Sequence, residues 1–214
     1  MMTFLPAPEV IAAYTAAALL LILTPGPDMT LFLGQTLTGG RSRGFAAFLG
    51  ASAGLFVHTM LAAFGLSALL AASATAFGVL KVIGCVYLLW LAFDAIRRGS
   101  ALTLAPGAGE PELIARVFFK GVAINLLNPK IIVFFLTFLP QFVSVSDPHA
   151  GAKLMFLGLY FIVLGLPTCA ILIVLAERFT GAIRRSPKVM RAVDYLFAGL
   201  MGAFAVRLLF ARTN

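Results

Sequence analysis

The sequence predicts an all-α integral membrane protein whose six transmembrane helices form two inverted three-helix repeats, with the first and fourth spans broken. The chain has 214 residues, of which 61% are hydrophobic and only 11% are charged, whereas soluble domains carry about 25% charged residues. Several apolar runs are about 20 residues long, the length that an α-helix needs to cross a bilayer. These runs lack the alternation of apolar and polar residues that transmembrane β-strands show.

The apolar runs set the expected positions of the six spans. They are 8–34, 43–70, 75–98, 113–142, 152–177 and 189–210. The connection at 101–111 contains two prolines and two glycines, so we expect a linker there. It divides a single membrane domain, 1–214, into a first repeat (1–100) and a second repeat (112–214). Three spans per repeat is an odd number, so the second repeat enters the membrane from the opposite side.

The basic residues predict the orientation of the spans. Most of the 16 Lys and Arg residues fall in the loops after the first, third and fifth spans. Because loops rich in Lys and Arg stay in the cytoplasm, both termini are expected on the periplasmic side. Topology and contacts with anionic membrane lipid then explain the net charge of +8, and no nucleic-acid partner is predicted.

The first span is interrupted by the segment Thr24-Pro25-Gly26-Pro27-Asp28. Each proline lacks a backbone donor and clashes with the preceding helical turn, and the glycine between them adds flexibility. At membrane depth such a break requires protein or a water-filled cavity to cover the freed backbone groups. The segment also places a carboxylate directly after the break.

The fourth span has a matching interruption at Asn128-Pro129-Lys130. Asn128 suits the N-cap of the helix that follows, and Pro129 suits its first position. Paired breaks at corresponding positions of two inverted halves indicate the central binding site of a transporter. We therefore predict that the two breaks meet near the membrane midplane and form the substrate or ion site.

Asp28 and Lys130 are charged residues within spans, where a charge costs about 2.5–3.5 kcal/mol on insertion scales. Such residues persist when they face an interior cavity or a partner, so we expect the two side chains to be near neighbours. Two other interpretations stay open. Asp28 would then only cap its restarted helix, and Lys130 would extend to the membrane interface.

The chemistry of the two breaks suits a zwitterion such as an amino acid. Backbone N–H groups at the half-helix N-termini of Pro27 and Pro129 can bind a carboxylate, and Asp28 can bind an ammonium group or titrate. Further hydrogen-bonding groups are Thr24, Thr30, Gln35 and Asn125. Small anions or cations could use the same parts.

Other polar and small residues in the spans have simpler explanations. His58 is a secondary candidate, because an interior hydrogen-bonded histidine is commoner than a proton relay. Asp94 and Asp194 each lie one turn from an arginine with which they can pair. Gly50 and Gly54 form a small-residue face that suits close packing, either within the chain or in a homodimer.

Enzyme signatures are absent from the sequence. It has no cluster of His, Cys and acidic residues for a metal, no nucleophile elbow and no phosphate-binding glycine loop. We therefore predict a transporter without metal or cofactor, and without a nucleotide site any uphill transport must use an ion gradient. The alternative is an exporter or channel for another small solute or a metal cation, using the same broken helices.

Several sequence stretches occur in a characteristic order. They are 23–29 (LTPGPDM), 40–44 (GRSRG), Gly50, 81–88 (KVIGCVYL), 125–130 (NLLNPK) and 134–143 (FFLTFLPQFV). This series resembles the signatures of the bacterial LysE/RhtB family of amino-acid exporters, and the likeness extends over nearly the whole chain.

The resemblance implies a bacterial inner-membrane protein of six helices that exports amino acids or their derivatives by exchange with protons. Members of the family move lysine, homoserine, threonine, leucine or cysteine-related compounds, so the individual substrate does not follow from membership. The resemblance is also compatible with a homodimer.

Overall fold

The computed structural model describes residues 6–66, 68, 74–98, 112–143, 147–176, 178 and 187–210. These residues form helices and turns with no strand among them, which confirms the predicted all-α class. The elements are α1 (Pro8–Leu23), α2 (Pro27–Gly39), α3 (Arg41–Met60), η1 (Leu61–Leu66), α5 (Ala74–Arg98), α6 (Ile114–Leu126), α7 (Pro129–Val133), η2 (Phe134–Phe138), η3 (Leu139–Phe142), α8 (Ala150–Val174) and α10 (Pro187–Phe210). The predicted linker at 101–111 and the expected ends of the second and fifth spans lie outside the described residues.

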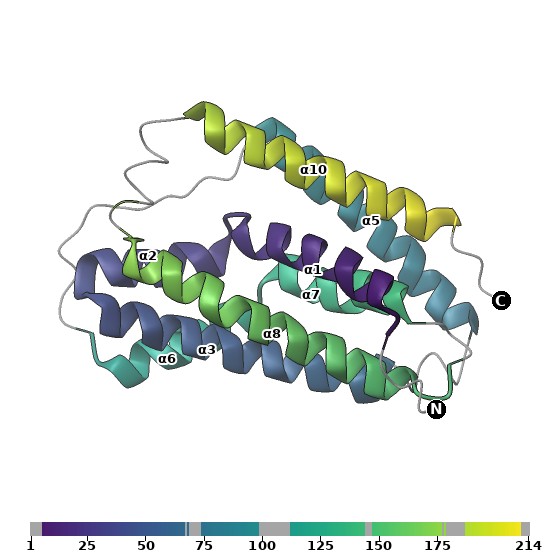
Figure 1. Ribbon diagram of the computed structural model, residues 1–214, viewed down its shortest axis with the longest axis horizontal. Coiled ribbons are helices and arrows are strands. Elements are labelled where there is room, and N and C mark those ends of the chain that lie inside the picture. Colours follow the sequence, from purple (N-terminus) through teal and green to yellow (C-terminus); the bar gives the residue numbers. More distant parts are fainter. Residues whose placement is uncertain are drawn as a thin grey trace.

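The helices lie side by side along one long axis (Figure 1). The two segments of each broken pair, α1–α2 and α6–α7, continue in the same general direction, and α1 begins at the end of the molecule where α10 ends. The α5 and α10 helices pack as a pair on one side, while α3 packs against α2, α6 and α8 on the other. The α1 and α7 helices lie between these two groups, where the breaks are found.

The lengths and compositions of the helices agree with a membrane protein. Arg41–Leu66 and Ala150–Val174 are each long and apolar enough to cross a bilayer. Two bent pairs also qualify if each counts as one span: α1 with α2, and α6 with Pro129–Phe142. Six crossings and an inverted-repeat relation between the halves stay predictions.

The first predicted break is present between α1 and α2, whose axes differ by 52°. Thr24 is the C-cap of α1. Pro27 begins α2, and its missing N–H would have no helical acceptor in any case. The α2 helix continues to Gly39, five residues beyond the predicted end of the span at 34. It stops because Gly40 adopts a φ of 84°, a left-handed conformation that favours glycine.

The second predicted break is present between α6 and α7, with a bend of 50°. Asn128 is the N-cap of α7, as predicted, and its side-chain Oδ1 accepts a hydrogen bond of 3.1 Å from the backbone N–H of Lys130. Pro129 occupies the first helical position. The helix then widens into the π-helical turn η2, a feature that is frequent near functional sites.

Glycines allow α3 and α6 to pack backbone against backbone. A Cβ atom added at Gly50 of α3 would collide with the carbonyl oxygen of Phe118, and one added at Gly121 of α6 would collide with that of Ala47. Of the two interpretations of the small-residue face, the structure therefore shows packing within the chain. These glycines give no argument for a dimer.

Two apolar clusters form the interior, and the breaks lie where they meet. The larger cluster surrounds Tyr14 and Phe134 and joins α1, η2, α8 and the α5–α10 pair. The smaller one surrounds Phe32 and Phe48 and joins α2, α3, α6 and the C-terminal half of α8. Ile22, directly before the first break, packs against both clusters.

Candidate functional site

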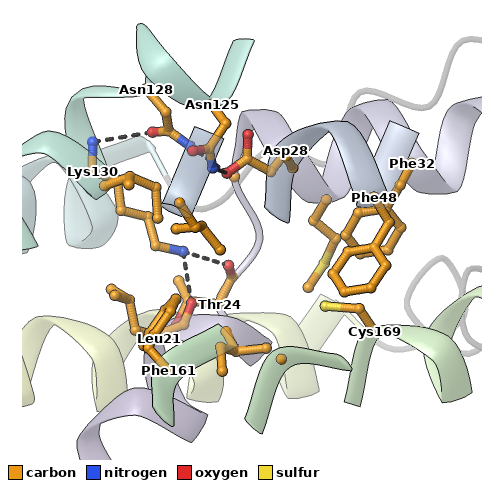
Figure 2. A pocket seen from close by; sticks show the side chains of 17 residues that line it. Leu21, Thr24, Asp28, Phe32, Phe48, Asn125, Asn128, Lys130, Phe161 and Cys169 are labelled. Atoms are coloured by element: carbon orange, nitrogen blue, oxygen red, sulfur yellow. Dashed lines mark hydrogen bonds between the residues drawn. The ribbon is translucent and has the colours of Figure 1, made fainter. Parts of the chain in front are cut away.

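The two breaks meet at a cavity of about 70 Å³, enough for several water molecules. We call it the Asp28 cavity. Its polar lining comes from both breaks: Thr24, Gly26, Asp28, Asn125, Asn128 and Lys130. The rest of its wall is apolar and includes Phe32, Phe48, Phe161 and Cys169, which Figure 2 shows around the cavity.

The Asp28 carboxylate is held by two amides from the other half of the chain. Its Oδ2 atom accepts hydrogen bonds from Asn125 Nδ2 at 2.8 Å and from Asn128 Nδ2 at 3.0 Å (Figure 2). Asp28 lies in the first turn of α2, but the N-cap residue is Gly26 and no side chain caps it. Asp28 therefore connects the two breaks and does more than serve its own helix end.

Two acceptor atoms of this network have no hydrogen-bond donor among the described residues. They are Oδ1 of Asp28 and Oδ1 of Asn125, and both are buried. Asn125 is 0% exposed, so bulk water does not reach its amide. A buried acceptor without a donor costs about 1–3 kcal/mol. Both residues line the cavity, so a cation, a proton or a water molecule that reached these oxygens would satisfy them.

Lys130 points inward toward the end of α1 and not out to the membrane interface. Its Nζ donates hydrogen bonds to the carbonyl oxygens of Leu21, at 2.8 Å, and Thr24, at 2.7 Å (Figure 2). A cation at a helix C-terminus is favourable because the last carbonyls have no helical donors. Asp28 and Lys130 line the same cavity, as predicted for near neighbours, but their side chains do not form an ion pair.

A second cavity, of about 230 Å³, lies on the other side of the breaks, against α5 and α10. We call it the α5–α10 cavity. Pro25, Pro27 and Pro129 line this cavity. So do Asp94 and Asp194, which the sequence places only beside arginines; Asp194 is 2% exposed. The spacing between two residues of one helix can predict that they pair. It does not predict which cavity either side chain borders.

Of the secondary candidates, His58 contacts a residue of the site, Asn125. Its Nε2 is 3.4 Å from the backbone oxygen of Asn125, and its ring stacks on Phe135 at a centroid distance of 5.6 Å. His58 borders neither of the two cavities. These contacts fit an interior histidine that packs behind Asn125.

Gln35 and Thr30 also border neither cavity. Gln35 lies two turns beyond Asp28, and its Nε2 donates to Oε2 of Glu112 at 3.1 Å, just before α6 begins. Glu112 also accepts from Lys120 Nζ at 3.0 Å, and this hydrogen bond holds the pKa of the Glu112 carboxyl below its usual value. Gln35 therefore joins α2 to the start of the second half of the chain, away from the breaks.

Sequence reasoning missed the apolar side of the site. Phe161 and Cys169 come from α8, where Pro167 lies inside the helix between them, but a proline alone does not identify a cavity wall. Within the described residues there is no group of three or more His, Cys, Asp or Glu side chains that could hold a metal ion. The arrangement can bind a small molecule that offers hydrogen-bond donors to one wall and an acceptor to the Lys130 ammonium.

Comparisons with known proteins give the site a context. Residues 19–212 match the family described as LysE type translocator. The chain is 32% identical, over 188 residues, to a homoserine/homoserine lactone efflux protein of Salmonella typhimurium, covering 88% of this chain and 90% of that one. The same figures hold for the protein of that name from Salmonella typhi. A membrane protein of Vibrio cholerae is 32% identical over 194 residues, with 88% and 90% covered. No solved structure matches.

Proposed function

The chain belongs to the LysE type translocator family and is a transporter, not an enzyme; we propose that it is a secondary active exporter of amino acids or amino-acid derivatives, coupled to protons by antiport. Two relatives at 32% identity are named as homoserine/homoserine lactone efflux proteins. That name suggests the substrate class to test first.

The observation that carries the proposal is that Asp28 and Asn125, which both line the Asp28 cavity, each have a buried Oδ1 without a donor among the described residues. An ammonium group has three donors, and next to a carboxylate it gains charge-assisted hydrogen bonds. A neutral solute without donors would leave both oxygens unsatisfied. The site therefore favours a solute with an ammonium group, which every amino acid carries.

The same carboxylate supports a mechanism of exchange. An ionised Asp28 attracts an ammonium group, whereas a protonated Asp28 is neutral and holds it weakly. Because the proton and the ammonium compete for one carboxylate, the site would carry one of them outward and the other inward. Alternate occupancy of a single group is the simplest basis for antiport.

Sequence reasoning also assigns the substrate carboxylate to the half-helix N-termini at Pro27 and Pro129. At Pro129 the first two N–H groups already have acceptors, because Lys130 N donates to the Asn128 side chain and Ile131 N to the Asn128 carbonyl. We therefore keep only the Pro27 end as a candidate among the backbone groups.

The proposal places the protein in the bacterial inner membrane, with six crossings, periplasmic termini and two inverted repeats at 1–100 and 112–214. The two bends support the repeats, because they are of similar size, 52° and 50°. Each bend is followed by a helix that begins with proline.

Efflux from proteoliposomes tests the function. Vesicles containing the purified protein are loaded with labelled homoserine or other amino acids. Efflux is followed with and without a proton gradient directed into the vesicles. We expect the gradient to accelerate efflux. Ion currents or metal-ion flux without any amino-acid movement would instead support the channel or metal exporter.

The Asp28→Asn variant tests the coupling, with Asp147→Asn as the matched control. Asp147 carries the same charge but pairs with Lys153 near the start of α8, outside both cavities. We expect Asp28→Asn to abolish gradient-driven efflux and Asp147→Asn to preserve it, with both proteins folded. Unchanged gradient-driven efflux in Asp28→Asn would rule out the coupling role.

A further inference from the structure

The Asp28 cavity and the α5–α10 cavity share a wall. Four residues border both of them: Thr24, Gly26, Asn128 and Lys130. Lys130 is the charged residue among the four, so its side chain stands between the two spaces. The carboxylates of Asp28 on one side and of Asp94 and Asp194 on the other are the remaining charged groups that line the cavities.

The Lys130 ammonium has neutral partners in this structure. It donates to the carbonyl oxygens of Leu21 and Thr24, and it lies 5.7 Å from the centre of the Phe197 ring of α10. A hydrogen bond between two charged groups is stronger than one between an ammonium and a neutral carbonyl. A carboxylate that reached this wall would therefore compete well for Nζ.

The sizes of the cavities also point to this wall. Small-molecule pockets measure about 300–1,000 Å³. The Asp28 cavity measures about 70 Å³ and the α5–α10 cavity about 230 Å³, so neither alone reaches that range. Joining them brings the volume to the lower end of the range. The wall that must move for this includes Lys130 and the end of α1, which its ammonium holds.

We propose that Lys130 recognises the carboxylate of the transported solute and that, by leaving the Leu21 and Thr24 carbonyls for that carboxylate, it opens the wall between the two cavities. The substrate class is then solutes with a free carboxylate. This inference rests on the proposed export function, which supplies the ammonium end of the solute at Asp28. Amides, esters and lactones of amino acids keep the ammonium group but lack the group that Lys130 binds.

A purely structural role for Lys130 makes a different prediction. If its ammonium only caps α1, replacing it weakens the fold and slows every solute alike. If it binds the carboxylate, replacing Lys130 slows the export of the amino acids more than the export of their lactones or amides. The ratio between an acid and its lactone or amide therefore separates the two roles.

The test compares efflux of homoserine with that of homoserine lactone, and of leucine with leucinamide, in proteoliposomes. The variant is Lys130→Met, which has a long side chain but no charge. Lys120→Met is the matched control, because Lys120 is an exposed lysine that pairs with Glu112 away from both cavities. We expect the wild type and Lys120→Met to prefer the acids, and Lys130→Met to lose at least about tenfold of that preference, the size of one lost charged hydrogen bond.

A second variant keeps Lys130 and its hydrogen bonds. A methyl group at Gly26 would sit 3.6 Å from Nζ and 3.7 Å from Cδ of Lys130, which is ordinary contact. The φ of −168° at Gly26 is extended backbone that alanine also adopts. We expect Gly26→Ala to fold with an unchanged melting temperature but to raise KM several-fold for homoserine and less for its lactone. Gly34→Ala, with nothing within 4 Å of its added methyl, is the control.

The following results would overturn the inference about Lys130. An acid-to-lactone ratio in Lys130→Met equal to that of the wild type overturns the inference while the export function stands. Equal export of homoserine and its lactone by the wild type would also overturn the inference and leave the export function standing. If Lys130→Met does not fold, an equal effect of Gly26→Ala on acid and lactone overturns it. If the wild type exports none of the four solutes, the proposed function and the inference fail together.

Discussion

The substitution Gly54→Ala tests whether the position of Asn125 controls the site. Gly54 lies on α3 directly against Asn125 of α6, and an added Cβ would sit 2.6 Å from Asn125 Oδ1 and 2.9 Å from its Cβ. Ordinary contacts begin at 3.4 Å, so the amide must move by about 0.8 Å. The hydrogen bond from Asn125 Nδ2 to Asp28 Oδ2 measures 2.8 Å. A shift of that size along the bond would lengthen it to about 3.6 Å, at which the bond is lost.

Two effects of Gly54→Ala can be given magnitudes. Overpacking a tight interface costs about 1–3 kcal/mol of stability, and losing a hydrogen bond to a charged group costs about 1.5–3 kcal/mol. We expect a lower melting temperature in detergent and an efflux KM for homoserine raised about tenfold or more. The Asp28 carboxylate would keep only the Asn128 amide.

Gly34→Ala is the control for this experiment as well, since its added methyl meets nothing within 4 Å. Alanine in a helix interior is favoured over glycine by about 0.5–1 kcal/mol, so this variant should be at least as stable as the wild type and should export normally. If Gly54→Ala matches Gly34→Ala in both melting temperature and KM, the reasoning about Asn125 is refuted.

Two further predictions concern His58, which packs behind Asn125, and Glu112, which lies away from both cavities. His58→Phe keeps the stacking on Phe135 and loses only a contact of 3.4 Å to the Asn125 backbone, so gradient-driven export should persist; a loss of coupling as severe as in Asp28→Asn would identify His58 as a proton relay. Lys120 lowers the pKa of Glu112 in the folded protein, so the stability that Glu112 contributes is present above its ordinary pKa of about 4.3 and is lost as the pH falls through the lowered value. Glu112→Gln should therefore reduce the drop in melting temperature below about pH 4, and an unchanged pH profile would contradict this.

Local sequence chemistry is sufficient to predict where the two helices are interrupted. Two prolines around Gly26, and an asparagine before Pro129, restrict the backbone within a few residues, so the break positions and the Asn128 cap follow from the sequence. The meeting of the two breaks at one cavity also matches the prediction. That prediction needed one tertiary assumption, namely that corresponding breaks in two halves face each other.

Tertiary contacts decide what sequence patterns could not. The sequence predicts Gln35 as a further hydrogen-bonding group of the site, yet α2 continues to Gly39 and the Gln35 side chain donates to Glu112. Asp194 has an arginine one turn away, and the packing of α10 against α5 also places it on the α5–α10 cavity. The apolar residues that α8 contributes to the Asp28 cavity, Phe161 and Cys169, lie in a sequence of ordinary apolar helix composition.

The two breaks have different roles, although the sequence suggests a symmetric pair. The second half supplies the donors: the Asn125 and Asn128 amides for Asp28, and the Lys130 ammonium for the carbonyls at the end of α1. The first half supplies acceptors, and the N–H groups that symmetry would offer at Pro129 are taken by Asn128. An amino acid has donors at one end and acceptors at the other, so it can replace partners on both sides of such a site. Two identical breaks would bind only one of the two charged groups of an amino acid. The difference between the breaks therefore matters more for the proposed export than their similarity.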